Sequence, residues 1–393
     1  MPVQCATPCP PLTDDSFQDL LARFAAVRDP RHPRGIRHTV QAILAIAAVA
    51  VLCGARSFAA IGEWACDAPQ RVLQLVGARW HQLLGRFVAP HESTLRRTIQ
   101  AFDAQLLDAV ICGWVVQQAG AKTEGPRRPA IAVDGKVVRG AWRTDGSQVH
   151  LLSAISHDTA VVLAQREIAA KTNEIPELST LLADLDLTGQ VVSADALHTQ
   201  RETARHLVAD RGADYVLTVK GNQPKLLAAC QKLLSGPAVD FTPEHVTLDR
   251  GHGRTEQRTT RVATVTGESA ITFPYAAQVF RIRRDVGGLD GQRTTKEIAH
   301  CITSLTPEQA TPEDLATYIR GHWQIENRLH WVRDVVFDED RSQIRTGAGP
   351  HVMASLRNLA ISALRLDGRT NIAESLRWNA RDPFRSLKIL GIA

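Results

Sequence analysis

The chain has 393 residues, of which 44% are hydrophobic and 22% are charged. This length predicts two or three domains, and the composition allows a sizeable core and excludes a wholly disordered chain. The formal net charge is +5, from 46 Lys and Arg against 41 Asp and Glu. Such a mildly basic balance permits a nucleic-acid partner without establishing one.

The cysteines and the apolar runs bear on the cellular compartment. The seven cysteines are scattered and form no CxxC pair, so the sequence gives no support for a zinc ribbon or a thioredoxin-like motif. The strongest apolar run, 42–55, has 14 residues, whereas a membrane span needs about 20. The first residues do not resemble a secretory signal. We therefore expect a cytoplasmic protein with reduced thiols and no membrane contact.

Helical patterns dominate the first part of the chain. We expect a disordered tail over 1–14 and a helical domain over 15–118, in which apolar residues recur at helical spacing. Within this domain, 28–37 is predicted to be a basic loop, because two prolines interrupt its four arginines. The loop either contacts a phosphate backbone or is simply solvated. A polar linker containing Gly and Pro follows over 119–129.

After the linker the pattern changes to that of an α/β domain, expected over 130–393. Strands rich in Val and Ile are predicted over 130–133 with 137–138, 149–155, 160–168, 190–194 and 215–220, and helices over 175–185, 198–210 and 224–234. The order β-β-β-α-β-α-β-α predicts a mixed sheet flanked by helices. We expect an inserted β-rich lobe at about 236–306, then a helix from Thr311 through Trp331 and final helices from about Pro350.

Two aspartates follow apolar strands and are the first candidates for chemistry. Asp134 follows Ile131-Ala132-Val133, and Asp195 follows 191–194. A right-handed crossover makes these strands natural neighbours, and adjacent strands lie about 4.8 Å apart. Two carboxylates at that separation repel each other unless a cation lies between them. We favour a metal site over the alternative in which each acid caps a strand end or pairs with a lysine.

A third acid, Glu326, lies in the helix predicted to run to Trp331. His322 and His330 lie one turn on either side of it, and this His-x3-Glu-x3-His spacing could build a zinc site. The two aspartates favour Mg²⁺ instead, because Mg²⁺ prefers oxygen ligands. Rival acids stand in the run that follows: Asp334, Asp338, Glu339 and Asp340.

Six sequence words in order carry a family resemblance: VDGKVVRG, KTNEIPEL, SADALHTQ, DYVLTVKGNQP, GHGRTEQR and GHWQIENRLHWVRDVVFDEDRS. Together they closely resemble the ISAs-type insertion-sequence DDE transposases, the group that includes the H-repeat-associated proteins. The resemblance runs from about Phe17 to the C-terminal helices and includes the family's N-terminal associated domain, with its start at Asp29-Pro30-Arg31. It implies a ribonuclease-H-like catalytic core with a β-rich insertion before the last acid, and an N-terminal helical domain that binds DNA ends.

The resemblance assigns the catalytic acids residue by residue. The DDE triad corresponds to Asp134 in VDGK, Asp195 in SADA and Glu326 in HWQIEN, and these residues would also bind Mg²⁺, with Mn²⁺ as a substitute. Related transposases carry a Tyr-x2-Arg-x3-Glu-x6-Lys signature around the last acid. Here Ile319 and His322 occupy the Tyr and Arg places.

The same signature also differs at its last position and in the neighbourhood of its first. Arg333 replaces the signature lysine, while Tyr318 and Arg320 stand one residue before the Tyr place and two before the Arg place, respectively. These departures are in keeping with the ISAs-type group, but they leave open which side chain holds the DNA there.

The implied activity is metal-dependent cleavage of DNA at the transposon end, followed by strand transfer into target DNA. The implied partners are the double-stranded DNA of the terminal inverted repeats and of the target, bound by a homodimer in the bacterial nucleoid. Two other functions stay open. One is a domesticated DNA-binding protein without catalysis, and the other is a ribonuclease-H-like nuclease.

Ten residues near these words are predicted to contact DNA: Lys136, Lys220, Asn222, Gln223, His252, Arg254, Arg258, Arg320, His322 and Arg333. Lys220 follows a strand and precedes a glycine turn, which brings backbone amides near phosphate. For Asn222 a purely structural turn is an equal alternative. The Gly-flanked loop of the inserted lobe either clamps the DNA end or is an exposed basic hairpin without a ligand.

Overall fold

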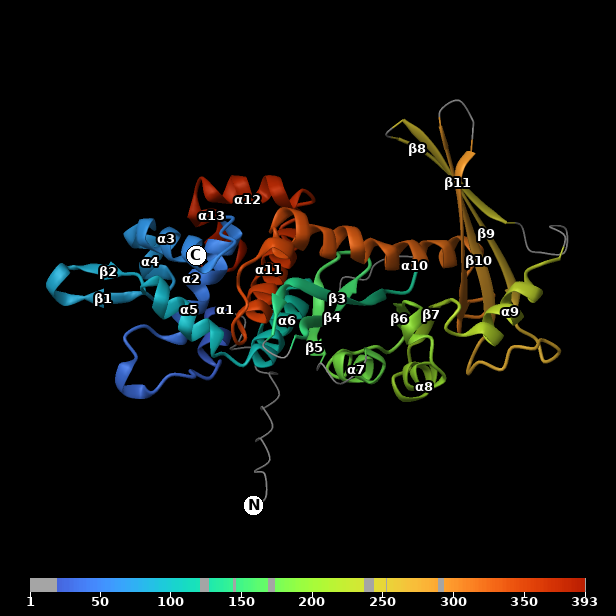
Figure 1. Ribbon diagram of the computed structural model, residues 1–393, viewed down its shortest axis with the longest axis horizontal. Helices are drawn as coiled ribbons and strands as arrows, with labels where there is room; N and C mark the ends of the chain where they lie inside the picture. The colour runs from blue at the N-terminus through green and yellow to red at the C-terminus, as the bar shows by residue number, and fades with distance from the viewer. Residues whose placement is uncertain are drawn as a thin grey trace, which may run out of the picture. The chain divides into compact units, whose positions relative to one another are not determined.

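In the computed structural model the chain forms two units, described over residues 20–120, 127–143, 146–168, 174–236, 244–251, 253–288 and 293–392 (Figure 1). The chain passes from a helical unit into a sheet-containing unit after Gly120 and returns to the helical unit after Arg341. The tail expected over 1–14 and the middle of the expected linker lie outside the described residues.

The helical unit begins with these elements: α1 (Leu20–Ala25), η2 (Pro33–Gly35), α2 (Val40–Leu52), α3 (Phe58–Asp67), α4 (Gln70–Leu75), β1 (Arg79–His81), η3 (Gln82–Leu84), β2 (Arg86–Val88), α5 (Glu92–Gln100) and α6 (Ala104–Ala119). The strongest apolar run forms α2, in which every residue but Gln41 is buried. Thr39 caps this helix by accepting a hydrogen bond from the Ala42 amide at 3.1 Å. No single described helix is long and apolar enough to cross a membrane, although α5 and α6 pass that test together as a pair bent by 95°.

The final helices lie in the helical unit, whereas we expected them within the domain over 130–393. They are α11 (Gly349–Leu366), α12 (Ile372–Ala380) and α13 (Pro383–Ile389). Helix α11 packs against α6 and α2 and is buried along nearly its whole length. Ser355 of α11 donates a 2.5 Å hydrogen bond to Asp108 of α6. The buried acid and hydroxyl therefore fix the contact between two helices that lie far apart in sequence.

The sheet-containing unit has nine strands: β3 (Ala130–Trp142), β4 (Gln148–Ser156), β5 (Val162–Ile168), β6 (Val191–Ala194), β7 (Asp214–Val219), β8 (His245–Gly251), β9 (Arg254–Thr264), β10 (Gln278–Gly288) and β11 (Arg293–Thr303). Its helices and turns are α7 (Glu174–Leu181), η4 (Ala196–His198), α8 (Arg201–Arg205), η5 (His206–Asp210), α9 (Pro224–Leu233), α10 (Pro312–Ile325), η7 (Glu326–His330), η8 (Val332–Val336) and η9 (Glu339–Arg341). The predicted succession of three strands and then alternating helices and strands is confirmed.

All nine strands form one sheet in the order β5-β4-β3-β6-β7-β11-β10-β9-β8. Strands β5, β4 and β3 pair antiparallel, whereas β3, β6 and β7 pair parallel, which is the mixed ribonuclease-H-like sheet that the sequence predicted. The inserted β-rich segment expected at about 236–306 contains β8, β9, β10 and β11. It extends the central sheet, because β11 pairs antiparallel with β7, with Cys301 opposite Thr218.

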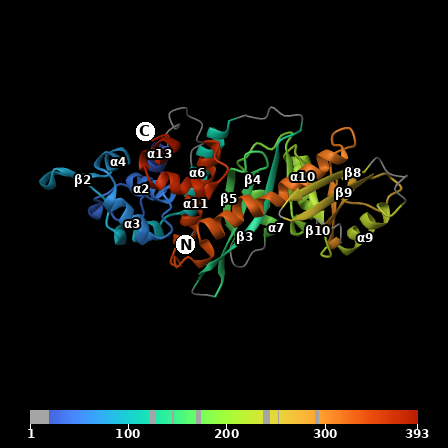
Figure 2. The same cartoon turned by 90° about the horizontal axis from the view of Figure 1, so that it is seen from above.

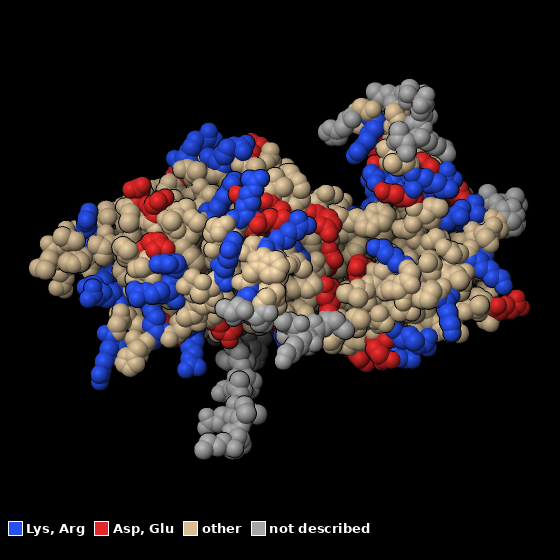
Figure 3. All heavy atoms as spheres, in the orientation of Figure 1, with Lys and Arg blue, Asp and Glu red and all other residues tan. Residues whose placement is uncertain are grey.

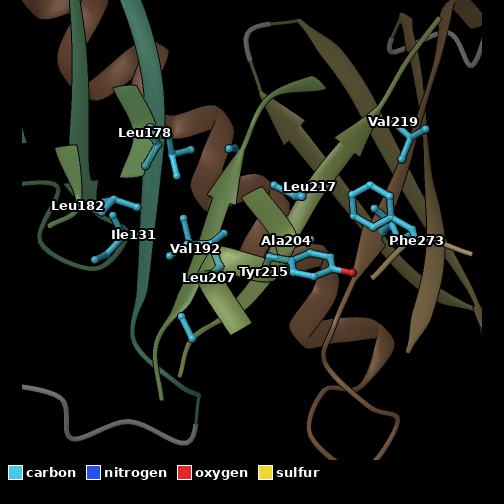
Figure 4. Packing of buried hydrophobic residues seen from close by; sticks show 14 of the residues in the cluster. Ile131, Leu178, Leu182, Val192, Ala204, Leu207, Tyr215, Leu217, Val219 and Phe273 are labelled. Atoms are coloured by element: carbon cyan, nitrogen blue, oxygen red, sulfur yellow. The ribbon is translucent and has the colours of Figure 1, made fainter. Parts of the chain in front are cut away.

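Apolar residues alternate along the central strands and build a core on each face of the sheet. On one face, Ile131, Val192 and Tyr215 pack under α7, α8 and α9, where Figure 4 shows Leu178, Leu182 and Leu207 lying against them. On the other face, the residues next in line along the same strands pack under α10. Figure 2 shows α10 running across the strands. Because successive side chains of a strand point to opposite faces of the sheet, every second strand residue faces α10.

Candidate active site

The first two acids lie side by side on neighbouring parallel strands. In the register of β3 and β6, Val133 stands opposite Ala194, and each of these residues is followed by an aspartate. Asp134 remains within the long strand β3, whereas Asp195 ends β6 and caps η4, its Oδ1 accepting a hydrogen bond from the Leu197 amide at 2.9 Å. Since adjacent strands lie about 4.8 Å apart, this register brings the two carboxylates close together at the ends of the paired segments of β3 and β6.

The third acid comes from the end of α10. Glu326 follows the last α-helical residue and begins the π-helical turn η7, so the helix predicted through Trp331 changes its winding at the acid. π-Helical turns inside helices are frequent at functional sites. The Glu326 side chain is 66% exposed, and its Oε2 lies 3.2 Å from Nδ1 of His330.

His330 joins the acids in one cluster. Its Nδ1 lies 3.6 Å from Asp134 Oδ2 as well as 3.2 Å from Glu326 Oε2. One ligand atom from each of Asp134, Glu326 and His330 lies within 4.8 Å of the others. The zinc alternative had included His330 through its spacing from Glu326, but had not linked it to Asp134. His322, the other histidine of that alternative, is not in this converging group of the described residues.

The electrostatics of the cluster favour a cation. Burial, the charge of Glu326 and the charge of Asp195 raise the pKa of Asp134 to about 7, against an ordinary value of 3.8. A hydrogen bond from His330 instead lowers the pKa of Glu326. A divalent metal ion would relieve the repulsion that raises the Asp134 pKa, and carboxylate oxygens are the ligands that Mg²⁺ prefers. The donor set therefore fits a divalent metal.

A cleft of about 510 Å³ opens at the three acids. Its lining includes Asp134, Asp195, Glu326, Lys220, Arg284, Glu297, His322 and Trp323. Two of the predicted DNA contacts, Lys220 and His322, thus lie in the same cleft as the acids. Burial lowers the pKa of His322 to about 4, so this imidazole is neutral at pH 7. Its Nδ1 is buried without a hydrogen-bond partner among the described residues.

A second titratable cluster, which the sequence analysis missed, lies beside the strand that carries Asp134. Glu174 at the start of α7 lies 2.9 Å from Nε2 of His150 and 3.2 Å from Nε2 of His198, which is fully buried. Burial raises the pKa of Glu174, whereas its close contacts with His150 and His198 lower it, and the net effect is a pKa of about 2. A side chain on Gly135 would overlap the Glu174 carboxylate, which shows how closely Glu174 approaches the strand that carries Asp134.

Two residues of this cluster lie in sequence words that carry the family resemblance, but their spacing along the chain gave no indication that they meet. Glu174 lies in KTNEIPEL and His198 in SADALHTQ, two of the words that carried the family resemblance. Neither residue stands at a metal-ligand spacing from the other acids in sequence. Only the packing of α7 against β4 and η4 brings Glu174 to both histidines.

Three of the predicted DNA contacts, Lys136, Asn222 and Gln223, donate hydrogen bonds to groups of the protein itself. The Lys136 side chain is 8% exposed, and its Nζ donates a hydrogen bond to Asp334 Oδ2 at 2.6 Å. The side-chain amides of Asn222 and Gln223 donate to the Ala196 and Thr199 carbonyls at 2.6 and 3.0 Å. In the structure Asn222 therefore has a structural role, because both side-chain amides bind carbonyls of the turn that follows Asp195.

Arg333 is the prediction that the structure contradicts. Its side chain is fully buried, and its guanidinium donates to the equally buried carboxylate of Glu339 at 2.7 Å. A DNA contact by Arg333 is therefore wrong, because a fully buried guanidinium presents no donor to a phosphate. The same pair occupies Glu339, and Lys136 binds Oδ2 of the rival acid Asp334, whereas its Oδ1 is buried without a hydrogen-bond partner among the described residues.

The remaining predicted contacts lie on the extended sheet and on α10. Asp249 of β8 receives Arg258 Nη1 at 2.6 Å and lies 3.7 Å from Arg320 Nη2. Arg254 is exposed and lines a separate hollow of about 400 Å³ together with Arg284. His252 lies outside the described residues.

Comparison with known proteins agrees with the resemblance. Residues 125–363 match the family described as the transposase DDE domain, and residues 21–115 match its associated N-terminal family. "Putative transposase YncI" of Escherichia coli O157:H7 is 30% identical over 89% of this chain and 88% of its own length. The "H repeat-associated putative transposase YhhI" of E. coli K12 is 27% identical over 89% of this chain and 91% of its own.

A cryo-EM structure titled as the piggyBac transposase synaptic complex with hairpin DNA aligns with 96% of this chain and 79% of that chain, at a TM-score of 0.43 and 9% identity. This likeness is too weak to bear on function. The assignment comes from the two family matches, which together account for most of the sequence. The chain belongs to the insertion-element transposase family that carries the DDE domain and its associated N-terminal domain.

Proposed function

We propose that this protein is an active DDE transposase, which cleaves DNA at the ends of its element and transfers the freed strand into target DNA. The observation that carries the proposal is the convergence of three acids of the family motif, Asp134, Asp195 and Glu326, on one cleft. The raised pKa of Asp134 supports the proposal, because it shows that the neighbouring carboxylates repel one another in the absence of a cation.

Asp134, Asp195 and Glu326 are the residues that would hold the metal, Mg²⁺ or its substitute Mn²⁺. When bound, such ions activate the attacking hydroxyl and stabilise the leaving oxygen of an in-line displacement at phosphorus. The protein's own part is to fix the carboxylates. The strand register holds Asp134, the Leu197 amide orients Asp195, and His330 orients Glu326.

The DNA partner fits the cations around the cleft. Lys220 lies in the cleft itself, and the neutral His322 imidazole lies beside it. Arg254 and Arg258 of the extended sheet and Arg320 of α10 would exchange solvent or the shared Asp249 carboxylate for phosphates of the DNA end. We infer double-stranded DNA of the inverted repeats and of the target as substrates, bound by a homodimer that pairs two ends.

A plasmid cleavage assay tests this function. A supercoiled plasmid carrying the inverted repeats that flank the gene would be incubated with the protein in Mg²⁺ or EDTA. We expect paired cuts at the repeats in Mg²⁺ only. Asp134→Ala should retain binding to the repeats and lower cleavage by on the order of 10³-fold. The control Asp210→Ala removes an exposed acid, which lies beside His206, and should leave cleavage unchanged.

Each alternative function predicts another result in the same assay. Cuts without regard to the repeats indicate a ribonuclease-H-like nuclease. Binding without cuts in any divalent metal indicates a domesticated DNA-binding protein. Full cleavage by Asp134→Ala would refute the assignment of this acid.

A further inference from the structure

The hairpin formed by β1 and β2 ends in an exposed apolar tip. Leu83 is 94% exposed and Leu84 is 55% exposed, and Trp80 beside them is 49% exposed. Figure 1 shows the hairpin extending from the helices of its unit, and Figure 3 shows uncharged side chains at its end. Adjacent leucines with this exposure cost solvation free energy in water and are typical of a contact surface.

The hairpin is held rigidly at its base. The side-chain amide of Gln70 makes two hydrogen bonds with the backbone of Phe87 in β2. Its Nε2 donates to the Phe87 carbonyl at 3.1 Å, and its Oε1 accepts from the Phe87 amide at 2.7 Å. Trp80 packs edge-on against Phe87 with ring centroids 5.0 Å apart. Gly85 closes the turn with a φ of 59°. The tip is therefore presented in one conformation, which lowers the entropy lost when it inserts into a partner.

The charged residues of the hairpin are both arginines. The sequence contains no Asp or Glu between Asp67 and Glu92, whereas Arg79 and Arg86 are exposed on the two strands of the hairpin. Burial and then the charges of Arg79, Arg31 and Arg37 lower the pKa of His38, which shows that the hairpin base and the basic loop 28–37 lie close together. Arg28, Arg34 and Arg37 of that loop are exposed. An apolar tip framed by arginines thus faces solvent.

We propose that this hairpin is a DNA wedge, in which Leu83 and Leu84 enter the minor groove at one base step while Arg79 and Arg86 contact the flanking phosphates. Apolar side chains that enter the minor groove unstack a base step and bend the duplex, and neighbouring cations hold the phosphates. The identity of the partner rests on the proposed function, but the wedge adds a second DNA contact, separate from the cleft at Asp134.

DNA fits this surface better than a protein partner does. A second copy of the chain joined symmetrically through the hairpin would bring the same arginines of both copies together, and their charges would repel. A phosphate backbone supplies negative charge on both sides of a groove, which matches arginines on both strands of the hairpin.

Binding and bending of DNA by the full-length protein test the wedge. The probe is a mixed-sequence DNA duplex labelled at its two ends with a donor and an acceptor fluorophore, studied in EDTA so that no cleavage occurs. The double variant Leu83→Ser, Leu84→Ser should bind about tenfold more weakly, bend the duplex less, and keep the wild-type salt dependence. The double variant Arg79→Gln, Arg86→Gln should flatten the salt slope by up to about two.

Val116→Ser is the matched control, because Val116 is an exposed apolar residue of the same unit (40% exposed) outside the hairpin. It should bind and bend DNA as wild type does. If the leucine variant matches wild type in affinity and bending, the wedge is refuted while the cleft assignment stands. If the leucine variant changes only self-association, measured by light scattering, the tip covers a second copy and the wedge is likewise refuted. If wild type binds no DNA at all, both the wedge and the proposed function fail.

Discussion

Gly321 of α10 lies directly against the imidazole ring of His157, so closely that a Cβ at this position would overlap the ring. His157 is anchored on the sheet through a 2.9 Å hydrogen bond between its Nε2 and Ser193 Oγ, on the strand that leads to Asp195. This contact sets how near α10 comes to the central strands. Because Glu326 follows α10 directly, it also sets the distance between Glu326 and the two aspartates.

Replacing Gly321 with alanine should therefore displace the end of α10. In an unconstrained helix this substitution stabilises by up to about 1 kcal/mol, so a loss identifies the contact with His157. We expect Gly321→Ala to lower both the free energy of unfolding and the rate of DNA cleavage. Gly267→Ala is the control, because a Cβ there meets nothing within 4 Å. Equal stability of the two variants in urea denaturation would show that α10 is not held by this contact.

The raised pKa of Asp134 predicts a pH-dependent gain from removing its charge. With a folded pKa of about 7 against an ordinary 3.8, the metal-free folded state retains a proton that the unfolded state releases. Wild type therefore loses stability as the pH rises from about 4 through 7. In EDTA at pH 8, Asp134→Asn should be more stable than wild type by on the order of 2 kcal/mol, and the gain should vanish near pH 4. Thermal unfolding across this pH range measures it.

A divalent metal ion should affect the stability of wild type and of Asp134→Asn differently. Mg²⁺ or Mn²⁺ should raise the melting temperature of wild type and leave that of Asp134→Asn nearly unchanged. A pH-independent difference between the variants, or equal stabilisation of both by metal, would contradict a crowded cation site at Asp134.

The contacts of the His150 and His198 imidazoles with the Glu174 carboxylate predict the opposite pH dependence. The folded pKa of Glu174 is about 2, below its ordinary 4.5, so its ionised form contributes stability above pH 4.5 that is lost as the pH falls toward 2. At pH 6 we expect Glu174→Gln to be destabilised by about 1–3 kcal/mol, with the difference shrinking on acidification. Glu202→Gln removes an exposed acid paired with Arg205 and should change little. Acid titration of unfolding distinguishes the two.

The buried pair of Arg333 and Glu339 predicts a large effect of single substitutions and a small effect of the double one. Arg333→Met leaves a buried carboxylate without its partner and should cost about 3–5 kcal/mol. Arg333→Met combined with Glu339→Leu should recover most of that stability. The salt dependence of DNA binding should not change in the folded double variant. A flatter salt slope would restore Arg333 to the DNA contacts.

Local patterns allowed the central sheet and the acids to be predicted. Asp134 and Asp195 each follow a short apolar strand, and strand order alone made those strands neighbours. Glu326 was reached through the helical pattern around it. The sheet could be predicted because strand alternation, helix starts and crossover handedness are consequences of a few adjacent residues and of chain direction.

Contacts between distant segments could not be predicted in this way. Nothing local indicates that β11 pairs with β7, or that α11 packs against α6. In the same way, an arginine in a polar run reads as a surface residue until the fold places Arg333 out of solvent beside Glu339.

The sequence by itself determined the succession of elements, the family and the acids of the candidate site. The tertiary structure alone decided which cations face solvent, which histidines support the acids, and that the hairpin at Leu83 presents apolar side chains among arginines. The physical reason is that burial and pairing depend on surfaces supplied by segments far apart in the chain. The sequence near a residue gives its charge and its place in a periodic pattern, but it does not give the residue's solvent exposure or its bonding partner.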